Sequence, residues 1–372
     1  MTSFKLNAAT DKAIFDALNQ HKVSKDAMLE MFFSRGVIVS KKTEKEDLAK
    51  QYSSYFHNYI DYDNLATILG VNKRKEKLTS FGLSTSITAE NVESKIKKIK
   101  EEVKVAGCSM EHRVLNSGKT IELTLTYQEF DLSKNDFQQM TTKDAVITIE
   151  NTDEGLNIRS PLNRKTKEVN NIIIDLLEDI DKDIKREDIQ LSQIKSPKVR
   201  CEFFETLVEC IDGYELVTVT DAYVYNPKKD ESENKKDEIH ITNASLKGKG
   251  VNLSSHLTDL HKKGFYTWKV IWHAVKENNS RSDLYVFEAQ FTNAEEFSDF
   301  SYMVKGSYKR KDTGIVSDLD GYNVNRTPVL LSEENTLNKL LEDAARLAIV
   351  KLTKSLGEDD SDDDSKKQVV LS

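Results

Sequence analysis

A short segment near the N-terminus carries the residues best suited to chemistry with a phosphate group. Residues 40–47 read SKKTEKED, which places Lys41, Lys42, Thr43 and Lys45 in one turn. Exposed backbone N–H groups and the dipole at the start of a helix favour an anion at such a turn. Lysines that contact phosphate also release counterions from nucleic acid. The segment therefore predicts nucleic acid as a class of partner.

The residues around this turn predict a helix, an extended stretch and a second helix. Ser24 is placed to cap the first helix and Gly36 to end it. Val37 to Val39 is short, apolar and β-branched, which is typical of extended backbone. Thr43 precedes Glu46 by three residues, the spacing of a capping box that begins the second helix.

Residues 24–59 resemble a SAP-like, helix–extension–helix DNA-binding module. In that family the glycine, the apolar residue after it and a leucine of the second helix set the fold, here Gly36, Val37 and Leu48. The polar turn then approaches the phosphate backbone. Acidic side chains in the same turn depart from a purely basic surface. The resemblance implies nucleic-acid contacts by Lys41, Lys42, Thr43 and Lys45, with Arg35 behind them, and the basic run Lys73, Arg74 and Lys75 adds to this charge.

Asp283 and the triplet Glu288-Ala289-Gln290 are the candidates for catalysis. The pattern is similar to that of metal-dependent nucleases of the PD-(D/E)xK type. Those enzymes carry one acid on a strand and an acid-x-lysine on the next, and here glutamine replaces the lysine. Alternation of polar residues along a half-exposed strand explains the same side chains. A divergent nuclease therefore remains an alternative, and we favour a protein without enzymatic activity.

The histidines and cysteines do not predict a metal site or a cofactor. His256 and His261 are five residues apart, whereas helical ligand pairs are spaced by three or four. Cys108, Cys201 and Cys210 form no CxxC pair, so we expect reduced thiols. The sequence also contains no GxxxxGK[ST] phosphate loop.

Aromatic residues alternate with polar ones in residues 265–272. A strand would place Tyr266, Trp268 and Trp272 on one face. Such a face could stack single-stranded bases, but packing in the core of a half-buried sheet is the interpretation we favour.

Composition describes a soluble, highly charged chain. Its 372 residues suffice for about two domains, and 31% of them are charged. No apolar run approaches the ~18 residues of a membrane span, and the first twenty residues lack the apolar core of a secretion signal. We therefore expect a cytoplasmic protein. The net charge of −8 opposes general nucleic-acid binding, although residues 358–364 alone supply six of the acidic side chains.

The periodicity of apolar residues changes along the chain and predicts an α+β fold. Helical spacing covers the first seventy residues, 89–103, 165–183 and 333–355, whereas a period of two begins near residue 107. A Leu-Leu-Glu-Asp stretch occurs in two of the predicted helices, which would fit a duplicated sheet-plus-helix unit or a coincidence. The predicted parts are a small all-helical SAP-like domain (1–78), a polar linker and bridging helix (79–104), an α+β domain of antiparallel sheet with long helices (105–356, in two units, 105–195 and 196–356) and an acidic disordered tail (357–372).

These patterns lead us to expect a non-enzymatic, DNA-associated accessory protein of a microbial multi-protein system, with phage defence as one setting. The N-terminal module would bind nucleic-acid backbone weakly, and the larger domain would serve assembly with a protein partner or further copies of the chain. The alternative is an oligomeric scaffold without a role in nucleic-acid binding.

Overall fold

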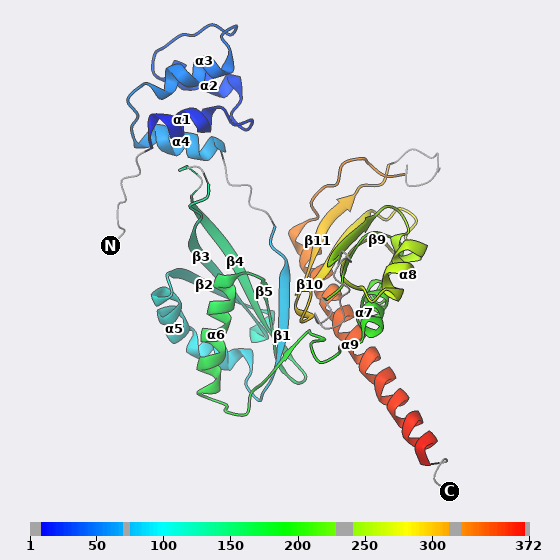
Figure 1. Cartoon of the computed structure of the whole chain (residues 1–372). Coiled ribbons are helices and arrows are strands. Elements are labelled where there is room, and N and C mark those ends of the chain that lie inside the picture. The colour runs from blue at the N-terminus through cyan, green and yellow to red at the C-terminus, as the bar shows by residue number, and fades with distance from the viewer. Residues whose placement is uncertain are drawn as a thin grey trace, which may run out of the picture. The chain divides into compact units, whose positions relative to one another are not determined.

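The computed structural model of this chain describes residues 9–69, 75–134, 136–137, 139–227, 241–311 and 321–368. It confirms an α+β fold with a large antiparallel sheet (Figure 1). The helices are α1 (Asp11–Leu18), α2 (Lys25–Ser34), α3 (Lys45–Ser53), α4 (Tyr59–Leu69), α5 (Ala89–Val105), α6 (Arg164–Glu178), α7 (Pro197–Glu209), α8 (Ser255–Lys262) and α9 (Leu331–Gln368), with short 3₁₀ turns at Asn116–Gly118 and Val251–Leu253.

The strands occur in one continuous order across the sheet. They are β1 (Leu78–Ser84), β2 (Cys108–Leu115), β3 (Thr120–Phe130), β4 (Met140–Thr152), β5 (Gly155–Pro161), β6 (Lys185–Asp188), β7 (Tyr214–Tyr225), β8 (Asn243–Lys247), β9 (Tyr266–Lys276), β10 (Leu284–Asn293) and β11 (Ser298–Tyr308). The order is β2-β3-β4-β5-β1-β11-β10-β9-β7-β8, and β6 pairs with β1.

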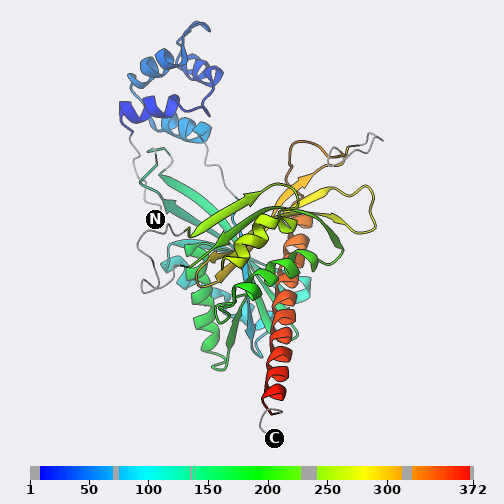
Figure 2. The same cartoon turned by 45° about the vertical axis from the view of Figure 1, so that its right-hand side comes forward.

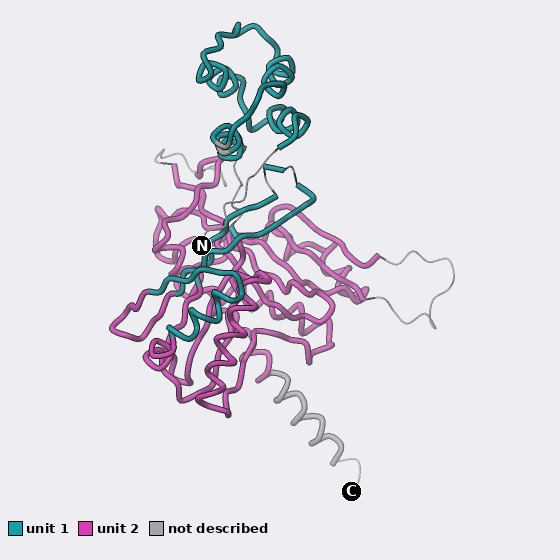
Figure 3. The backbone as a smooth tube through the Cα atoms, turned by 90° about the vertical axis from the view of Figure 1, so that its left-hand side faces the viewer, with its two compact units in different colours: residues 1–75, 96–112, 123–146 teal, residues 76–95, 113–122, 147–372 magenta. Residues whose placement is uncertain are grey.

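The chain divides into two compact units (Figure 3). Unit 1 comprises residues 1–75, 96–112 and 123–146, and unit 2 comprises residues 76–95, 113–122 and 147–372. The N-terminal helices therefore share their unit with later segments of the chain.

Unit 1 contains the helices α1 to α4 and their own apolar core. Thr10 and Ser24 cap α1 and α2 as predicted, and each accepts a hydrogen bond from a backbone N–H three residues later. Phe32 and Leu48 lie in this core, which also takes Phe137 from the segment between β3 and β4. The ring of Phe137 stacks on Tyr62 with centroids 4.7 Å apart. The N-terminal helices thus pack against Phe137 as well as against one another.

The polar stretch 79–88, expected to be a linker, instead contains most of β1. This strand pairs with β5 from Leu78 to Ser84 and with β6 from Phe81 to Ser84. The prediction was wrong because the small residues mask a real alternation. Phe81 and Leu83 are buried on one face, and threonine and serine fit a strand interior when both edges are paired.

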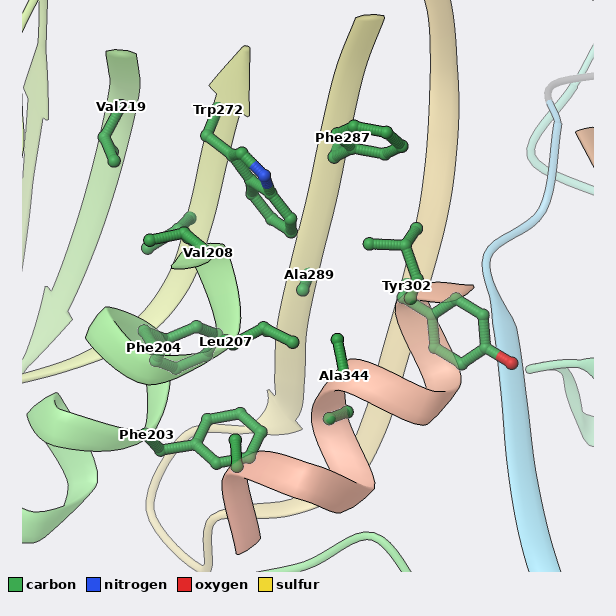
Figure 4. Close-up of a cluster of buried hydrophobic side chains, with 14 of the residues drawn as sticks. Phe203, Phe204, Leu207, Val208, Val219, Trp272, Phe287, Ala289, Tyr302 and Ala344 are labelled. Atoms are coloured by element: carbon green, nitrogen blue, oxygen red, sulfur yellow. The ribbon is translucent and has the colours of Figure 1, made fainter. Parts of the chain in front are cut away.

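The apolar core of unit 2 lies between the strands β7 to β11 and the helices α7 and α9 (Figures 1 and 2). In Figure 4, Trp272, Phe287 and Tyr302 point from β9, β10 and β11 toward the two helices. All three side chains are fully buried, as are Tyr266 and Val270 of the aromatic strand. Core packing of that strand is therefore confirmed.

The acidic C-terminal segment differs from its prediction. The segment 357–372, predicted to be a disordered acidic tail, continues the helix α9 as far as Gln368. This segment has no proline to end the helix, and its residues follow an anchored stretch directly. Most of the charged segment 226–238 lies outside the described residues.

An ion pair joins β5 to α9 beside the strand β1. Both Nε and an Nη atom of Arg159 lie 2.7 Å from one carboxylate oxygen of Glu342, and the Tyr302 hydroxyl donates to the same oxygen at 3.2 Å. Arg346 adds a contact of 3.3 Å to the other oxygen. Burial alone would raise the pKa of Glu342, but the two arginines outweigh it, and the pKa is lowered.

Removing the charge of Glu342 should destabilise unit 2. We expect Glu342→Gln to lower the free energy of unfolding by about 3 kcal/mol, because Arg159 would be left buried without a full counter-charge. Urea unfolding followed by circular dichroism measures the change. The control is Glu178→Gln, which alters the exposed glutamate of the other Leu-Leu-Glu-Asp stretch and should shift stability by less than about 0.5 kcal/mol. Equal effects of the two substitutions would contradict a stabilising role for the ion pair.

Candidate functional site

The segment predicted to contact nucleic acid has the expected order of elements. The helix α2 ends at Ser34, and Gly36 follows with a positive φ of 74°. The backbone N–H of Val37 then donates to the carbonyl of Phe32 at 3.0 Å, which closes the helix end. Residues 37–40 belong to no helix or strand, and α3 begins at Lys45.

Arg35 was expected to lie behind the phosphate contacts, and its side chain contacts other residues of the N-terminal helices. Its guanidinium lies 2.6 Å from an oxygen of Asp61 and 3.1 Å from Nδ1 of His57, and it covers the ring of Tyr52 at 4.8 Å. Burial, with Arg35 nearby, lowers the pKa of His57. Arg35 therefore ties α2 to α3 and α4, and its charge is offset by Asp61.

Lys45 also has a contact within the module. Its ammonium group donates to the backbone carbonyl of Gln20 at 2.6 Å and lies 3.4 Å from that of Asn19. These carbonyls are at the C-terminal end of α1, where a cation is favourable. Lys45 thus joins two helices.

Lys41 and Lys42 are exposed, and Thr43 is half-buried. The turn is held by Ser40, whose hydroxyl accepts from the backbone N–H of Lys42 and whose carbonyl accepts from that of Thr43, both at 3.1 Å. The predicted capping box at Thr43 and Glu46 is wrong. Glu44 is the N-cap residue and makes no side-chain cap, because α3 begins one residue later than the pattern predicts.

Three further basic residues belong to the prediction. Lys73 and Arg74 lie outside the described residues, and Lys75 is exposed.

The acidic candidates for catalysis are held by separate partners. Asp283, just before β10, lies 2.5 Å from the ammonium group of Lys309 and accepts from the backbone N–H of Arg310 at 3.3 Å. Glu288 lies further along β10 and contacts other lysines. Within the described residues, no group of three or more histidine, cysteine, aspartate or glutamate side chains could hold a metal ion.

Glu288 is surrounded by three lysines that the sequence did not single out together. Lys77 and Lys269 approach one carboxylate oxygen at 2.7 and 2.8 Å, and Lys305 approaches the other at 2.5 Å. Lys77 also donates to the side-chain oxygen of Gln290. We call Lys77, Lys269, Lys305 and Glu288 the lysine cluster.

The alternation of β10 explains why Glu288 leaves the core. Phe287, Ala289 and Phe291 belong to the apolar core that contacts α7 and α9. Glu288 and Gln290 alternate with them and therefore point to the opposite face of the sheet. On the neighbouring strand β9, Lys269 lies directly opposite Gln290 and reaches the same face.

A β-bulge places the third lysine. Val286 is opposite Gly306 and Phe287 is opposite Val304, so Lys305 is the additional residue on β11. Gly306 has a φ of 135°, and a Cβ atom there would come within 2.4 Å of the carbonyl oxygen of Thr327. Glycine is therefore required beside the bulge.

The lysine cluster carries more positive than negative charge. The side chain of Glu288 is 3% exposed, whereas those of Lys77, Lys269 and Lys305 are 24%, 16% and 25% exposed. Burial acts to raise the pKa of Glu288, but hydrogen bonds from the three lysines outweigh it and lower the pKa to about 2. Burial also lowers the pKa of Lys77, against the opposing effect of Glu288.

Only part of this cluster could have been found from sequence. Lys269 and Lys305 interrupt apolar strands at positions that a core would not accept, and this signal predicts an uncovered sheet face. The third lysine, Lys77, lies before β1, and only the tertiary structure brings it to these strands.

Comparisons of this chain with protein-family models, with curated proteins and with solved structures give no match. Among the described residues, no helix has the length and apolar character needed to cross a membrane.

The stabilising effect of Glu288 should depend on pH. Its pKa is about 2 in the folded protein and 4.5 for the ordinary side chain, so its stabilising effect is complete above pH 4.5 and is lost as the pH falls toward 2. Urea unfolding between pH 2.5 and 6, a range set by that shift, should show that Glu288→Gln and wild type differ most at the upper end and converge in acid. Glu277→Gln, an exposed change on the loop after β9, is the control. A difference that stays constant with pH would contradict the assignment.

Proposed function

We propose that this chain is a non-enzymatic, DNA-associated accessory protein of a microbial multi-protein system, with phage defence as one setting. Its N-terminal segment acts as a SAP-like helical domain that binds nucleic-acid backbone weakly. The proposal includes a cytoplasmic location, where the nucleic acid of a microbial cell is accessible, and a protein partner or further copies of the chain.

One observation supports the proposal most directly. Lys41 and Lys42 are exposed on a turn that Ser40 holds in shape, immediately before a helix whose N-cap residue makes no side-chain cap. Uncapped N–H groups and adjacent ammonium groups are the components of a phosphate contact. Arg35 and Lys45 support this turn from within the module and need not reach the nucleic acid.

Acidic neighbours account for the weakness of the proposed binding. Three acidic residues close in sequence to Lys41 and Lys42 are exposed, namely Glu44, Glu46 and Asp47. Their charges repel phosphate over distances shorter than the Debye length, which is about 8 Å at physiological salt. We therefore expect binding at low salt that weakens steeply as salt is added.

Neutralising the two exposed lysines should weaken the binding of duplex DNA by the full chain. Each lost phosphate contact removes close to one unit from the slope of log K against log salt, so Lys41→Gln with Lys42→Gln should flatten that slope by about 2. Fluorescence anisotropy over a salt series measures it. The matched control, Lys12→Gln with Lys50→Gln, removes the same charge from exposed positions elsewhere in the module.

Neutralising the acidic residues of the same turn provides a second test. Glu46→Gln with Asp47→Asn should strengthen binding, because it removes repulsion at the same turn. Wild-type protein that does not bind DNA at low salt, or a slope unchanged by loss of Lys41 and Lys42, would refute the proposed contact.

A second candidate function, an oligomeric scaffold or protein-interaction subunit without a nucleic-acid role, is favoured by exposed apolar side chains. Phe33, Ile38, Phe56 and Ile60 are each at least 66% exposed. Phe56 and Ile60 directly precede His57 and Asp61, which both contact Arg35. Large exposed apolar side chains of this kind are the residues that a protein contact buries.

If this second function holds, substituting these residues should reduce self-association. We expect Phe33→Ser with Phe56→Ser to shift an oligomer toward a smaller species in size-exclusion chromatography with light scattering. Samples are treated with nuclease first, so that bound nucleic acid does not hold copies together. The control is Ile241→Ser with Leu253→Ser, two exposed apolar residues outside the module. Identical masses for the wild type and the Phe33/Phe56 variant would exclude these residues from a self-contact.

A further inference from the structure

We propose that the lysine cluster of unit 2 is a binding site for a phosphate group, carried by a nucleotide or by a nucleic-acid chain. This site is separate from the turn of the N-terminal module. All of its residues belong to unit 2, and it does not depend on the function proposed above.

The charge balance of the cluster points to an anionic ligand. Three ammonium groups contact one carboxylate, so the cluster keeps an excess of two positive charges. One lysine would neutralise Glu288, and Gln290 is uncharged. Two unit charges about 4 Å apart repel strongly even near a protein surface, so gathering three ammonium groups opposes folding unless a ligand or solvent offsets the charge. A terminal phosphate with a charge near −2 matches the excess.

The arrangement of the side chains leaves part of each lysine exposed. The side chain of Glu288 is almost fully buried, whereas those of the three lysines are each partly exposed. An ammonium group has three N–H donors, and the bond to Glu288 uses one of them. The carboxylate thus holds the three groups together at the surface. Such pre-organisation reduces the entropic cost of binding.

An aromatic ring beside the cluster favours a ligand that carries a base. The ammonium group of Lys269 lies 4.8 Å from the ring centre of Tyr223, and that of Lys247 lies 6.0 Å from it. Tyr223 lies directly opposite Lys269 on β7 and is half-buried. Stacking of a base on this ring adds to a phosphate contact without requiring a particular base.

Binding of ATP, of inorganic phosphate and of a deoxythymidine oligonucleotide to the full chain tests the site. Isothermal titration calorimetry at low salt should detect ATP or the oligonucleotide binding more tightly than inorganic phosphate. A preference for ATP would identify a nucleotide as the source of the phosphate, and a preference for the oligonucleotide would identify a nucleic-acid chain. Affinity for inorganic phosphate equal to both would overturn the contribution of Tyr223.

The decisive variant is Lys269→Gln with Lys305→Gln. It leaves Lys77 and Glu288 as a neutral pair, so no buried charge is left uncompensated and the protein should fold. We expect the affinity to fall by at least about ten-fold, because two charge-assisted hydrogen bonds are lost. The matched control, Lys262→Gln with Lys263→Gln, removes two exposed charges near the C-terminal end of α8 and should bind as wild type.

One further variant separates this proposal from the first. Lys41→Gln with Lys42→Gln should leave ATP binding unchanged. The proposal is overturned if none of the three probes binds the wild type at low salt, or if the Lys269/Lys305 variant binds as tightly as the wild type.

Discussion

The strands of unit 2 are joined through a single short strand, β1, and this seam constrains the arrangement of the residues around it. Along β5 the strand β1 pairs over its full length, but in the described structure its pairing with β11 is confined to Leu78, opposite Tyr302. A backbone hydrogen bond contributes about 1 kcal/mol to stability. The seam therefore depends on side chains on both faces of the sheet.

Charged side chains on each face of the sheet stabilise the junction at β1. On the side of α9, Arg159 of β5 reaches Glu342, which also accepts from Tyr302 of β11. On the opposite face, Lys77 lies directly before β1 and reaches Glu288 of β10. The first network balances its two arginines, Arg159 and Arg346, with Glu342 and with Glu150, which lies 3.6 Å from Arg159. The second contains an excess of lysine, and this asymmetry is why we assign a ligand to one face and a structural role to the other.

Local patterns in the sequence were sufficient for the elements whose stability is local. Ser24 caps α2 and Gly36 ends it, both as predicted. The stretch 79–88 was mistaken for a linker because serine and threonine occur in loops and in strands alike. Their conformation is decided by the strands that pair with them.

The site residues were harder to interpret because a charge has no fixed role until its partner is known. Arg35 and Lys45 have the right residue type for a phosphate contact, but Asp61 and the carbonyls of α1 take up their donors. Conversely, Glu288 was identified as a candidate for catalysis, and three ammonium groups contact its carboxylate. The lysines come from the residue before β1, from β9 and from β11, which lie far apart in sequence, so no local pattern could have joined them.

The two proposed cationic sites should differ in their response to salt, although the chain as a whole carries a charge of −8. Lys41 and Lys42 are exposed and stand beside carboxylates, so salt screens them readily and their binding depends on released counterions. The lysines around Glu288 are partly buried and already held in place, so screening affects them less and little side-chain entropy remains to be lost. Net charge sets the long-range repulsion of a polyanion, whereas these local arrangements decide whether a phosphate group is retained once it arrives. An acidic protein can therefore bind phosphate where its own carboxylate has gathered the cations.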